Sequence, residues 1–421
     1  MRNIALTFLG CFTILAACSN SDDAEKPVAP IPTGDVTIYS TTNSLTRDLT
    51  RDAVNFSLKD NLAPTSITLN PTEQYQTMDG FGVAITGATC FNLLQMKPED
   101  RHAFLTETFS DDKGFGFSYI RISIGCSDFS LSEYTCCDKK GIENFALQSE
   151  EKEYILPILK EILDINPSIK IIAAPWTCPT WMKVKSLTDL TPFESWTNGQ
   201  LNPAYYQDYA TYFVKWVQAF NAEGIDIYAV TPQNEPLNRG NSASLYMSWE
   251  EQRDFVKTAL GPKFKTAGLA TKIYAYDHNY DYSDIETEKN YPGKMYEDPA
   301  ASQYLAGAAY HNYGGNREEL LNMHKAYPEK ELLFTETSIG TWNSGRDLSK
   351  RLLEDMKEVA LGTINNWCKG VIVWNLMLDN DRAPNREGGC QTCYGAVDIS
   401  NSDYKTIIRN SHYYIIAHLS S

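Results

Sequence analysis

Two glutamates lie where strand-like runs of the chain end. Glu235 follows the apolar run 225–230 and Glu336 follows the run 331–335. Hydrolysis of a glycosidic bond needs a carboxylic acid that protonates the leaving oxygen, and a second carboxylate that acts as nucleophile or as base for water. A parallel barrel would turn two such strand ends toward one cavity. A single glutamate would more often be a solvated surface charge, so it is the shared context of the two that indicates a glycosidase site.

The residues beside the two carboxyl groups favour different roles for them. A general acid must keep its proton near neutral pH, which requires an apolar environment or a nearby like charge. Glu235 fits this acid, and its neighbour Asn234 is a neutral donor that could hold a sugar hydroxyl beside the reacting carbon. Glu336, which follows Phe334 and Thr335, fits the nucleophile.

Strand-like and helical segments alternate from Gly80 onward, and they are the elements that must position the glutamates. Strand-like runs cover 80–88, 119–125, 170–175, 225–231, 272–276, 306–310, 331–335 and 370–374. Helical periodicity lies between most of them, at 98–109, 151–163, 205–220, 249–260, 317–327 and 348–367. Eight strands alternating with helices predict an α/β fold, the (β/α)8 TIM barrel. The alternative is a doubly wound sheet, but no Gly-rich phosphate loop follows the first strand.

Composition narrows the class of partner. The chain has 37 Lys and Arg against 53 Asp and Glu, a formal net charge of −16, which argues against binding a nucleic-acid backbone. A neutral carbohydrate substrate is compatible with this charge. The six histidines include no His-x-x-x-His pair, and no dense Asp cluster is present. A metallohydrolase is therefore disfavoured, and we expect no metal and no cofactor.

The N-terminus has the pattern of an export signal. Arg2 precedes an apolar stretch, 4–17, that is too short to span a membrane as a helix and ends in Leu15-Ala-Ala-Cys18. This ending resembles a bacterial lipobox. We expect a signal peptide at 1–17, a lipidated Cys18 and a tether at 18–34, which would place the protein in the cell envelope as an outer-membrane lipoprotein of a Gram-negative bacterium. The alternative is an ordinary cleaved signal peptide in which Cys18 is incidental.

The cysteines beyond the signal favour disulfides or buried thiols over a metal site. An exported chain can oxidise some of its cysteines. The Cys390-Gln-Thr-Cys393 spacing fits half of a zinc site, but the other close pair, Cys136 and Cys137, is adjacent and poorly suited to chelation. Buried thiols or a local disulfide are therefore the preferred interpretation.

Motifs along most of the chain resemble glycoside hydrolase family 30. The two glutamate motifs are Thr231-Pro-Gln-Asn-Glu-Pro236 and Phe334-Thr-Glu-Thr-Ser338. The other motifs that match in the family's order are Met78-Asp-Gly-Phe-Gly82, Tyr119-Ile-Arg-Ile-Ser123, Cys126-Ser-Asp-Phe-Ser130, Ala174-Pro-Trp-Thr-Cys-Pro-Thr-Trp181, Tyr310-His-Asn-Tyr-Gly314 and Trp374-Asn-Leu376. The resemblance implies a retaining mechanism through a covalent glycosyl-enzyme, with Glu235 as acid/base and Glu336 as nucleophile. The two carboxyl groups should then lie roughly 5–5.5 Å apart.

The resemblance also implies roles for other site residues. Arg121 would lie behind the nucleophile and keep it ionised. The remaining positions would form the sugar pocket: Asp128 and Trp176 binding hydroxyls of the glycone sugar, His311 and Tyr313 beside the carboxylates, and Trp374 offering a ring face for stacking.

Each of these residues has a simpler structural explanation when it is considered alone. Arg121 could form a structural ion pair, Asp128 a helix cap or surface charge, and the tryptophans part of the core. The matched order of the motifs makes them site candidates. Asp277, His278 and Trp342, near the ends of two other strands, are weaker candidates because their flanking residues are less diagnostic.

Family members carry a β-sandwich beside the barrel, built from a short N-terminal piece and a longer C-terminal run. We expect residues 35–75 to supply the first piece and residues 76–405 to form the barrel. Residues 406–421 would then be only the start of the second piece, either because the chain is truncated or because its sandwich is rudimentary.

The resemblance is greatest to the bacterial branch that acts on β-1,6-glucan, so the expected activity is that of a glucan endo-1,6-β-glucosidase. A glucosylceramidase or an exo-acting β-glucosidase or β-xylosidase of the same family is the alternative. From another class, a non-catalytic glycan-binding lipoprotein would keep the aromatic residues and lose a carboxylate, whereas both glutamates are present.

Overall fold

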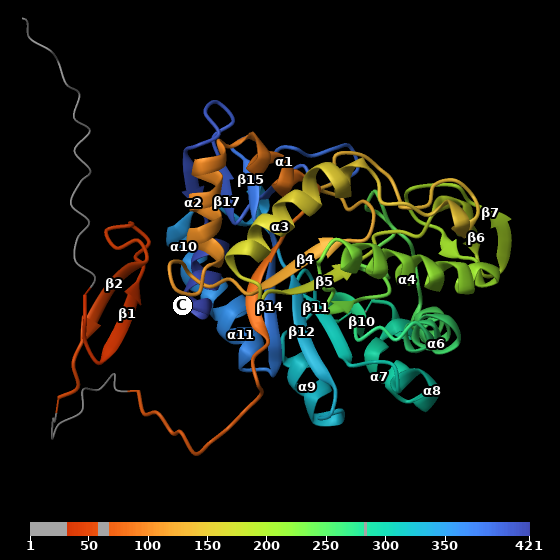
Figure 1. The fold of residues 1–421 in the computed structure, drawn as a ribbon. Helices are drawn as coiled ribbons and strands as arrows, with labels where there is room; N and C mark the ends of the chain where they lie inside the picture. Colours follow the sequence, from red (N-terminus) through yellow and green to blue (C-terminus); the bar gives the residue numbers. More distant parts are fainter. Residues whose placement is uncertain (1–31, 58–66, 282–283) are drawn as a thin grey trace, which may run out of the picture.

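The computed structural model describes residues 32–57, 67–281 and 284–421 (Figure 1). The expected signal peptide, Cys18 and most of the tether lie outside the described residues. Within the described ranges, no helix combines the length and the apolar character that crossing a membrane requires.

Eight parallel strands close into a barrel (Figure 1). In order around the barrel they are β3 (Gly80–Ala84), β4 (Tyr119–Ser123), β5 (Lys170–Ala174), β9 (Ala229–Val230), β10 (Lys272–Asn279), β11 (Gly307–His311), β12 (Glu331–Glu336) and β14 (Cys368–Asn375). β14 pairs with β3 and closes the ring. The predicted TIM barrel is confirmed, and each predicted strand region overlaps one barrel strand.

β9 is much shorter than the predicted run 225–231. It is assigned over two residues, although the backbone N–H groups of Tyr228 and Thr231 still donate to carbonyls of β5. The extended conformation therefore continues beyond the assigned strand and leads the chain toward Glu235.

Helices surround the barrel (Figure 1). They are α1 (Gly87–Gln95), α2 (Pro98–Phe109), α3 (Leu156–Ile165), α4 (Tyr206–Ala222), α5 (Trp249–Phe255), α6 (Gly261–Thr266), α7 (Tyr291–Tyr296), α8 (Pro299–Ser302), α9 (Glu318–Ala326), α10 (Leu348–Asp355), α11 (Leu361–Ile364) and α12 (Ser411–Ser420). Three short π-helical segments adjoin these helices: Glu151–Ile155 precedes α3, Val256–Leu260 joins α5 to α6, and Met356–Ala360 joins α10 to α11. All six helical regions predicted from periodicity are present.

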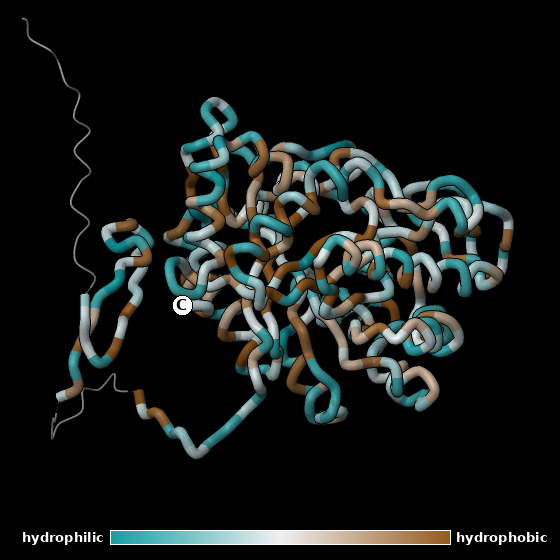
Figure 2. The backbone as a smooth tube through the Cα atoms, in the orientation of Figure 1, coloured by the Kyte–Doolittle hydropathy of each residue, from teal (hydrophilic) through white to brown (hydrophobic). Residues whose placement is uncertain are grey.

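The barrel interior is filled by side chains from its own strands. One apolar cluster contains residues of seven strands: Tyr119, Ile172, Ala229, Tyr274, Ala309, Leu333 and Ile372. Figure 2 shows hydrophobic segments concentrated in the middle of the barrel. Gly82 permits the close pairing of β3 with β4, because a Cβ atom there would lie 1.6 Å from the carbonyl oxygen of Tyr119. The barrel is thus a packed core that leaves the carboxyl ends of its strands for chemistry.

The prediction that residues 406–421 begin a β-sandwich is wrong. β18 (Ile407–Arg409) pairs with β17 (Val397–Ile399), which pairs with β15 (Met377–Asp379), and α12 follows. Residues 411–417 of α12 are all buried, and Tyr413 packs on Phe117 and hydrogen-bonds to Thr108. Burial on every side favours the helix over the strand propensity of its Tyr-Tyr-Ile-Ile run.

The N-terminal β segment expected within 35–75 is present as a hairpin beside the barrel (Figure 1). β1 (Val36–Ser40) pairs antiparallel with β2 (Thr50–Val54). Thr41 hydrogen-bonds to His418 of α12 at 2.9 Å, and Tyr39 packs edge-on against Phe115. The hairpin therefore contacts the barrel domain through α12 and through the segment between α2 and β4.

Candidate active site

Arg121 is the buried centre of an ion network at the carboxyl ends of the barrel strands. Its guanidinium donates to Glu336 Oε2 at 2.6 Å, to Asp277 Oδ2 at 2.9 Å and to Asn234 Oδ1 at 2.7 Å. The side chain is fully buried. A guanidinium remains protonated in such a site, so its charge offsets those of the two carboxylates. Arg121 therefore lies beside Glu336, as the resemblance implies.

Replacing Arg121 with alanine should lower the free energy of unfolding by about 3–5 kcal/mol, because it leaves two buried carboxylates without their cation. The matched control is Lys160→Ala, which breaks a half-exposed ion pair with Glu223 and should cost about 0–1 kcal/mol. Urea denaturation followed by circular dichroism measures both. Equal effects of the two substitutions would contradict the importance of the network.

Glu336 is the last residue of β12 and is held by two partners, Arg121 and Tyr313. Besides Arg121, the Tyr313 hydroxyl lies 3.0 Å from Glu336 Oε1, and the same hydroxyl lies 3.0 Å from Ser338 Oγ. Burial raises the pKa of Glu336 above its ordinary value, although the charges of His311 and Arg121 oppose the rise. The carboxylate is thus fixed in place and more basic than a solvated glutamate.

Glu235 adopts a backbone conformation that is rare for residues other than glycine. Its φ is +43°, and its N–H group donates to the carbonyl oxygen of Asp277 at 2.9 Å. The amide of Asn238 donates to Glu235 Oε2 at 2.7 Å, while Oε1 lies 3.1 Å from His311 Nδ1. Strain of this kind persists where the surroundings fix the backbone, and it is concentrated at functional sites.

Asp277 fixes the orientation of His311. Its carboxylate lies 3.1 Å from His311 Nε2 and accepts hydrogen bonds from the hydroxyls of Thr231 at 2.7 Å and Thr335 at 2.6 Å. Burial would raise the pKa of Asp277, but the Arg121 charge and these hydrogen bonds hold it well below its ordinary value. The ionised Asp277 therefore accepts a hydrogen bond from Nε2–H of His311, and Nδ1 faces Glu235.

One proton is held between His311 Nδ1 and Glu235 Oε1. Burial opposes the charged form of His311, yet Glu336 and the hydrogen bonds to Asp277 and Glu235 raise its pKa to about 9. Burial likewise opposes ionisation of Glu235, but His278 and His311 lower its pKa to about 2. These opposite pKa shifts favour the proton on His311 in the free site, one hydrogen bond away from the carboxylate that would deliver it.

A pH profile tests this shared proton. Activity that depends on the proton held between His311 and Glu235 should fall as the pH rises through about 9, the pKa of His311. In His311→Gln, Glu235 must hold the proton alone, so the basic limb of kcat/KM should move to lower pH by about one unit or more. His324→Gln changes a histidine that stacks on Trp367 and is the control. A basic limb that stays near its original position in His311→Gln would contradict the shared proton.

The two carboxyl groups are close enough for a retaining mechanism. One oxygen of Glu235, one oxygen of Glu336 and a ring nitrogen of His311 all lie within 4.8 Å of one another. Retaining glycosidases separate their carboxyl groups by about 5–5.5 Å and inverting ones by about 6.5–9.5 Å. These three groups are also close enough together to bind a metal ion, but the two ring nitrogens of His311 already contact Asp277 and Glu235.

A pocket of about 310 Å³ opens above the two glutamates. Of the predicted residues, Glu235, Glu336, Asp128, Tyr313 and Trp374 line it, and the weaker candidates His278 and Trp342 do as well. The others lie behind this surface and support it: Arg121, Asn234, His311 and Trp176. The side-chain oxygen of Asn234 accepts a hydrogen bond from Arg121, and its amide N–H groups are left as donors.

Trp176 and Trp374 stack on each other, with ring centroids 5.2 Å apart. The Arg121 guanidinium lies 4.9 Å from the ring centroid of Trp176 and 5.3 Å from that of Trp374. Trp176 is 1% exposed, so its predicted contact with the sugar stays a prediction. In the structure Trp176 packs against the ring of Trp374 and the guanidinium of Arg121, and so supports both.

Asp128 and a disulfide form another part of the pocket wall. Burial, together with the charges of Glu336 and Glu235, raises the pKa of Asp128 to about 7. Cys390 and Cys393 form a disulfide that also lines the pocket. The sequence left a local disulfide and buried thiols as alternatives, and at this pair the structure has the disulfide. The six other described cysteines are buried thiols: Cys90, Cys126, Cys136, Cys137, Cys178 and Cys368.

Several pocket residues were not found from the sequence: Asn238, Asn241, Asn279 and Ser338. Asn238 and Ser338 follow their glutamates by three and two positions, and this proximity in sequence was the available signal. Asp277 was undervalued because its role depends on a local irregularity of β10, where Tyr276 and Asp277 both have positive φ and the register with β11 shifts.

Comparison with known proteins identifies the family. The family model described as the glycosyl hydrolase family 30 TIM-barrel domain matches residues 78–421. The chain belongs to glycoside hydrolase family 30. The match runs through α12, in agreement with the assignment of this helix to the barrel.

Relatives in this family include enzymes named for two substrates. An endo-1,6-β-D-glucanase of Trichoderma harzianum is 32% identical over 366 residues, 82% of this chain and 69% of the relative. The lysosomal acid glucosylceramidase of Mus musculus is 27% identical over 347 residues, 76% of this chain and 63% of the relative. The solved structure of the endo-β1,6-glucanase BT3312 is 88% identical, with a TM-score of 0.91, and covers 92% of this chain and 84% of that chain.

Proposed function

We propose that this family 30 glycoside hydrolase is a retaining endo-β-1,6-glucanase. The observation that carries the mechanism is the buried pair of carboxylates, Glu235 and Glu336, within 4.8 Å of each other at their nearest oxygens. The substrate class is supported by the 88% identity with a solved endo-β1,6-glucanase. Glucosylceramidases are similar to this chain at lower identity and remain the alternative within the family.

In the first step, Glu336 attacks the anomeric carbon of the bound glucosyl unit and forms an ester. The bond to the leaving oxygen breaks, and Glu235 transfers the proton that it shares with His311 to that oxygen. Arg121 and the Tyr313 hydroxyl hold the attacking carboxylate in place. The leaving glucan chain departs with its new hydroxyl group.

In the second step, the ionised Glu235 takes a proton from water, and the resulting hydroxide attacks the anomeric carbon. The ester bond to Glu336 breaks and the carboxylate returns to its partners Arg121 and Tyr313. Two displacements at one carbon restore its original β configuration. The proton regained by Glu235 passes back onto the hydrogen bond with His311.

The walls of the pocket bind the glycone sugar in this proposal. Asp128 accepts a hydrogen bond from a sugar hydroxyl when it is ionised and can donate one when it is protonated, since burial and the two glutamates raise its pKa to about 7. The part of Trp374 that lines the pocket packs on the sugar ring, while Trp176 and Asn234 support it from behind. Sugars are bound in this way by a few placed polar groups on an apolar and aromatic wall.

Substrate and stereochemistry can be tested together. The protein should degrade β-1,6-glucan to a mixture of oligosaccharides, with much slower turnover of β-1,3-glucan and glucosylceramide. Proton NMR during the first minutes should show the β-anomer at each new reducing end. Release of glucose alone would indicate exo action, preferential glucosylceramide turnover would favour the alternative, and an initial α-anomer would exclude the retaining mechanism.

We further propose that the protein is exported and anchored to the outer membrane through a lipid on Cys18, its sole contact with a membrane. The lipobox-like ending Leu15-Ala-Ala-Cys18 supports this proposal. In a Gram-negative host the full chain should fractionate with outer membranes and incorporate labelled palmitate. Cys18→Ala should lose both properties, and its continued fractionation with membranes would contradict the anchor.

A further inference from the structure

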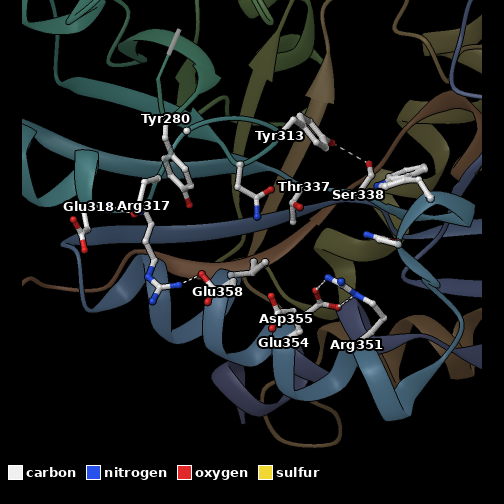
Figure 3. Close-up of a pocket in the computed structure, with 16 residues that line it drawn as sticks. Tyr280, Tyr313, Arg317, Glu318, Thr337, Ser338, Arg351, Glu354, Asp355 and Glu358 are labelled. Carbon is white, nitrogen blue, oxygen red and sulfur yellow. Dashed lines mark hydrogen bonds and ion pairs between the residues drawn. The ribbon is translucent and has the colours of Figure 1, made fainter. Parts of the chain in front are cut away.

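A second cavity adjoins the catalytic pocket. It has a volume of about 570 Å³ and is lined by residues that follow β10, β11 and β12, together with one side of α10 (Figure 3). Three residues line both spaces: Tyr313, Ser338 and Trp342. A ligand that passes these three side chains would enter the second cavity directly from the catalytic pocket.

The second cavity lies across the barrel mouth from the proposed glycone wall. Asp128 follows β4, Trp374 is on β14, and these strands flank β3. The second cavity belongs to the other arc of the barrel, formed by β10, β11 and β12. A glucan chain whose glycone unit lies against Asp128 would therefore continue toward the second cavity on its leaving-group side.

Two aromatic rings stand at the boundary between the spaces. Trp342 is 54% exposed and Tyr313 is 44% exposed, which is high for large aromatic side chains. Exposed rings of this kind offer flat apolar faces to the C–H groups of a pyranose. The boundary therefore has the chemistry of a sugar platform.

Paired charges form the polar lining of the second cavity. Arg317 pairs with Glu358, and Arg351 pairs with Asp355, as drawn in Figure 3. Side-chain amides, including that of Asn312, add donors and acceptors. Opposed charges and amides offer many hydrogen bonds to hydroxyl groups without requiring a charged ligand.

Tyr280 points a buried hydroxyl into this cavity (Figure 3). The residue is 6% exposed and its ring packs on Tyr310 and Phe334. Within the part of the chain that the structure describes, no group hydrogen-bonds to its hydroxyl. A buried hydroxyl without a partner costs free energy, which a ligand hydroxyl in the cavity would recover.

We propose that the second cavity binds glucose units of the substrate chain on the leaving-group side of the cleaved bond. Its volume is in the range of ligand sites, about 300–1,000 Å³. The inference rests on the proposed function, since the ligand is the aglycone part of the same β-1,6-glucan. Binding of these units would make long chains better substrates than short ones and would account for cleavage within a chain.

The test compares β-1,6-linked glucose oligomers of two to six units with 4-nitrophenyl β-glucoside, whose leaving group ends beside the catalytic pocket. Tyr280→Phe removes the inward hydroxyl and keeps the shape. Its control is Tyr296→Phe, since Tyr296 is also 6% exposed, has an unpartnered hydroxyl and does not line this cavity. Glu354→Trp fills the cavity from α10, and Lys350→Trp is its control on the same helix.

In the wild type, kcat/KM should rise with oligomer length. Tyr280→Phe should lower kcat/KM for the hexamer by about 5- to 10-fold, Glu354→Trp by more, and neither should change turnover of the nitrophenyl glucoside. The proposed second site would be overturned if Tyr280→Phe and Glu354→Trp lowered kcat/KM equally for the hexamer and for the nitrophenyl glucoside. It would also be overturned if their kcat/KM for the hexamer equalled that of the control variants. A wild type that cleaves the nitrophenyl glucoside but no β-1,6 oligomer would overturn the proposed function, and with it this inference.

Discussion

Glu336→Gln should lower the turnover of β-1,6-glucan by about 10⁴- to 10⁶-fold, the range seen when a covalent nucleophile is removed. The amide cannot form the ester, while Arg121 and Tyr313 keep contacts with a side chain of similar shape. Initial rates on β-1,6-glucan measure the loss. Glu329→Gln, an exposed position before β12, is the matched control and should retain full activity.

Azide distinguishes loss of the nucleophile from misfolding. In Glu336→Gly, azide can occupy the vacated space and attack the anomeric carbon of an aryl β-glucoside. A single displacement should yield the α-glucosyl azide. A β-glucosyl azide, or an active Glu336→Gln protein, would contradict the assignment of Glu336.

Glu235→Gln should lower the turnover of β-1,6-glucan by about 10²- to 10⁴-fold, the usual contribution of general acid–base catalysis. Formation of the glycosyl-enzyme from a dinitrophenyl β-glucoside should be much less affected, because dinitrophenolate leaves without a proton. The intermediate should then accumulate, since water has lost its base. Stopped-flow traces should therefore show a burst of dinitrophenolate followed by a slow steady rate.

Azide also separates the acid/base role of Glu235 from a structural one. An ionic nucleophile needs no base, so azide should speed the slow phase of Glu235→Gln and give the β-glucosyl azide. Glu250→Gln, an exposed change on α5, is the control and should behave as the wild type does. Equal losses on glucan and on the dinitrophenyl glucoside, with no burst, would contradict the proposed role.

Much of the barrel could be predicted from the sequence because most strands are short runs of residues with high β-propensity, followed by a segment with helical periodicity. Residues 98–109 match α2 at both ends, with Pro98 at the first helical position, where proline is favoured. β9 was predicted too long, since the strand pairing on both of its sides covers only Ala229 and Val230. The α12 error arose because a Tyr-Tyr-Ile-Ile run favours strand locally, while its complete burial depends on the tertiary structure.

The candidate site was predictable where one motif holds a residue in place and less so where several segments meet. Glu336 ends β12 and Glu235 follows β9 within one short motif, so the local pattern was sufficient to find both. Asp277 joins Arg121, His311 and two threonines through an irregular turn of β10, and no local pattern reveals these long-range contacts. The second cavity is harder still, because its lining comes from four separated segments.

Direct trapping of the covalent intermediate tests the central claim, which is that Glu336 forms a bond to the sugar. The protein would be incubated with a 2-deoxy-2-fluoro-β-glucoside that carries a good leaving group, digested, and analysed by tandem mass spectrometry. We predict one fluoroglucosyl group per chain, attached to Glu336 and absent from Glu336→Gln. Attachment to Glu235 or another residue, or complete lack of labelling in a fully active preparation, would contradict the account.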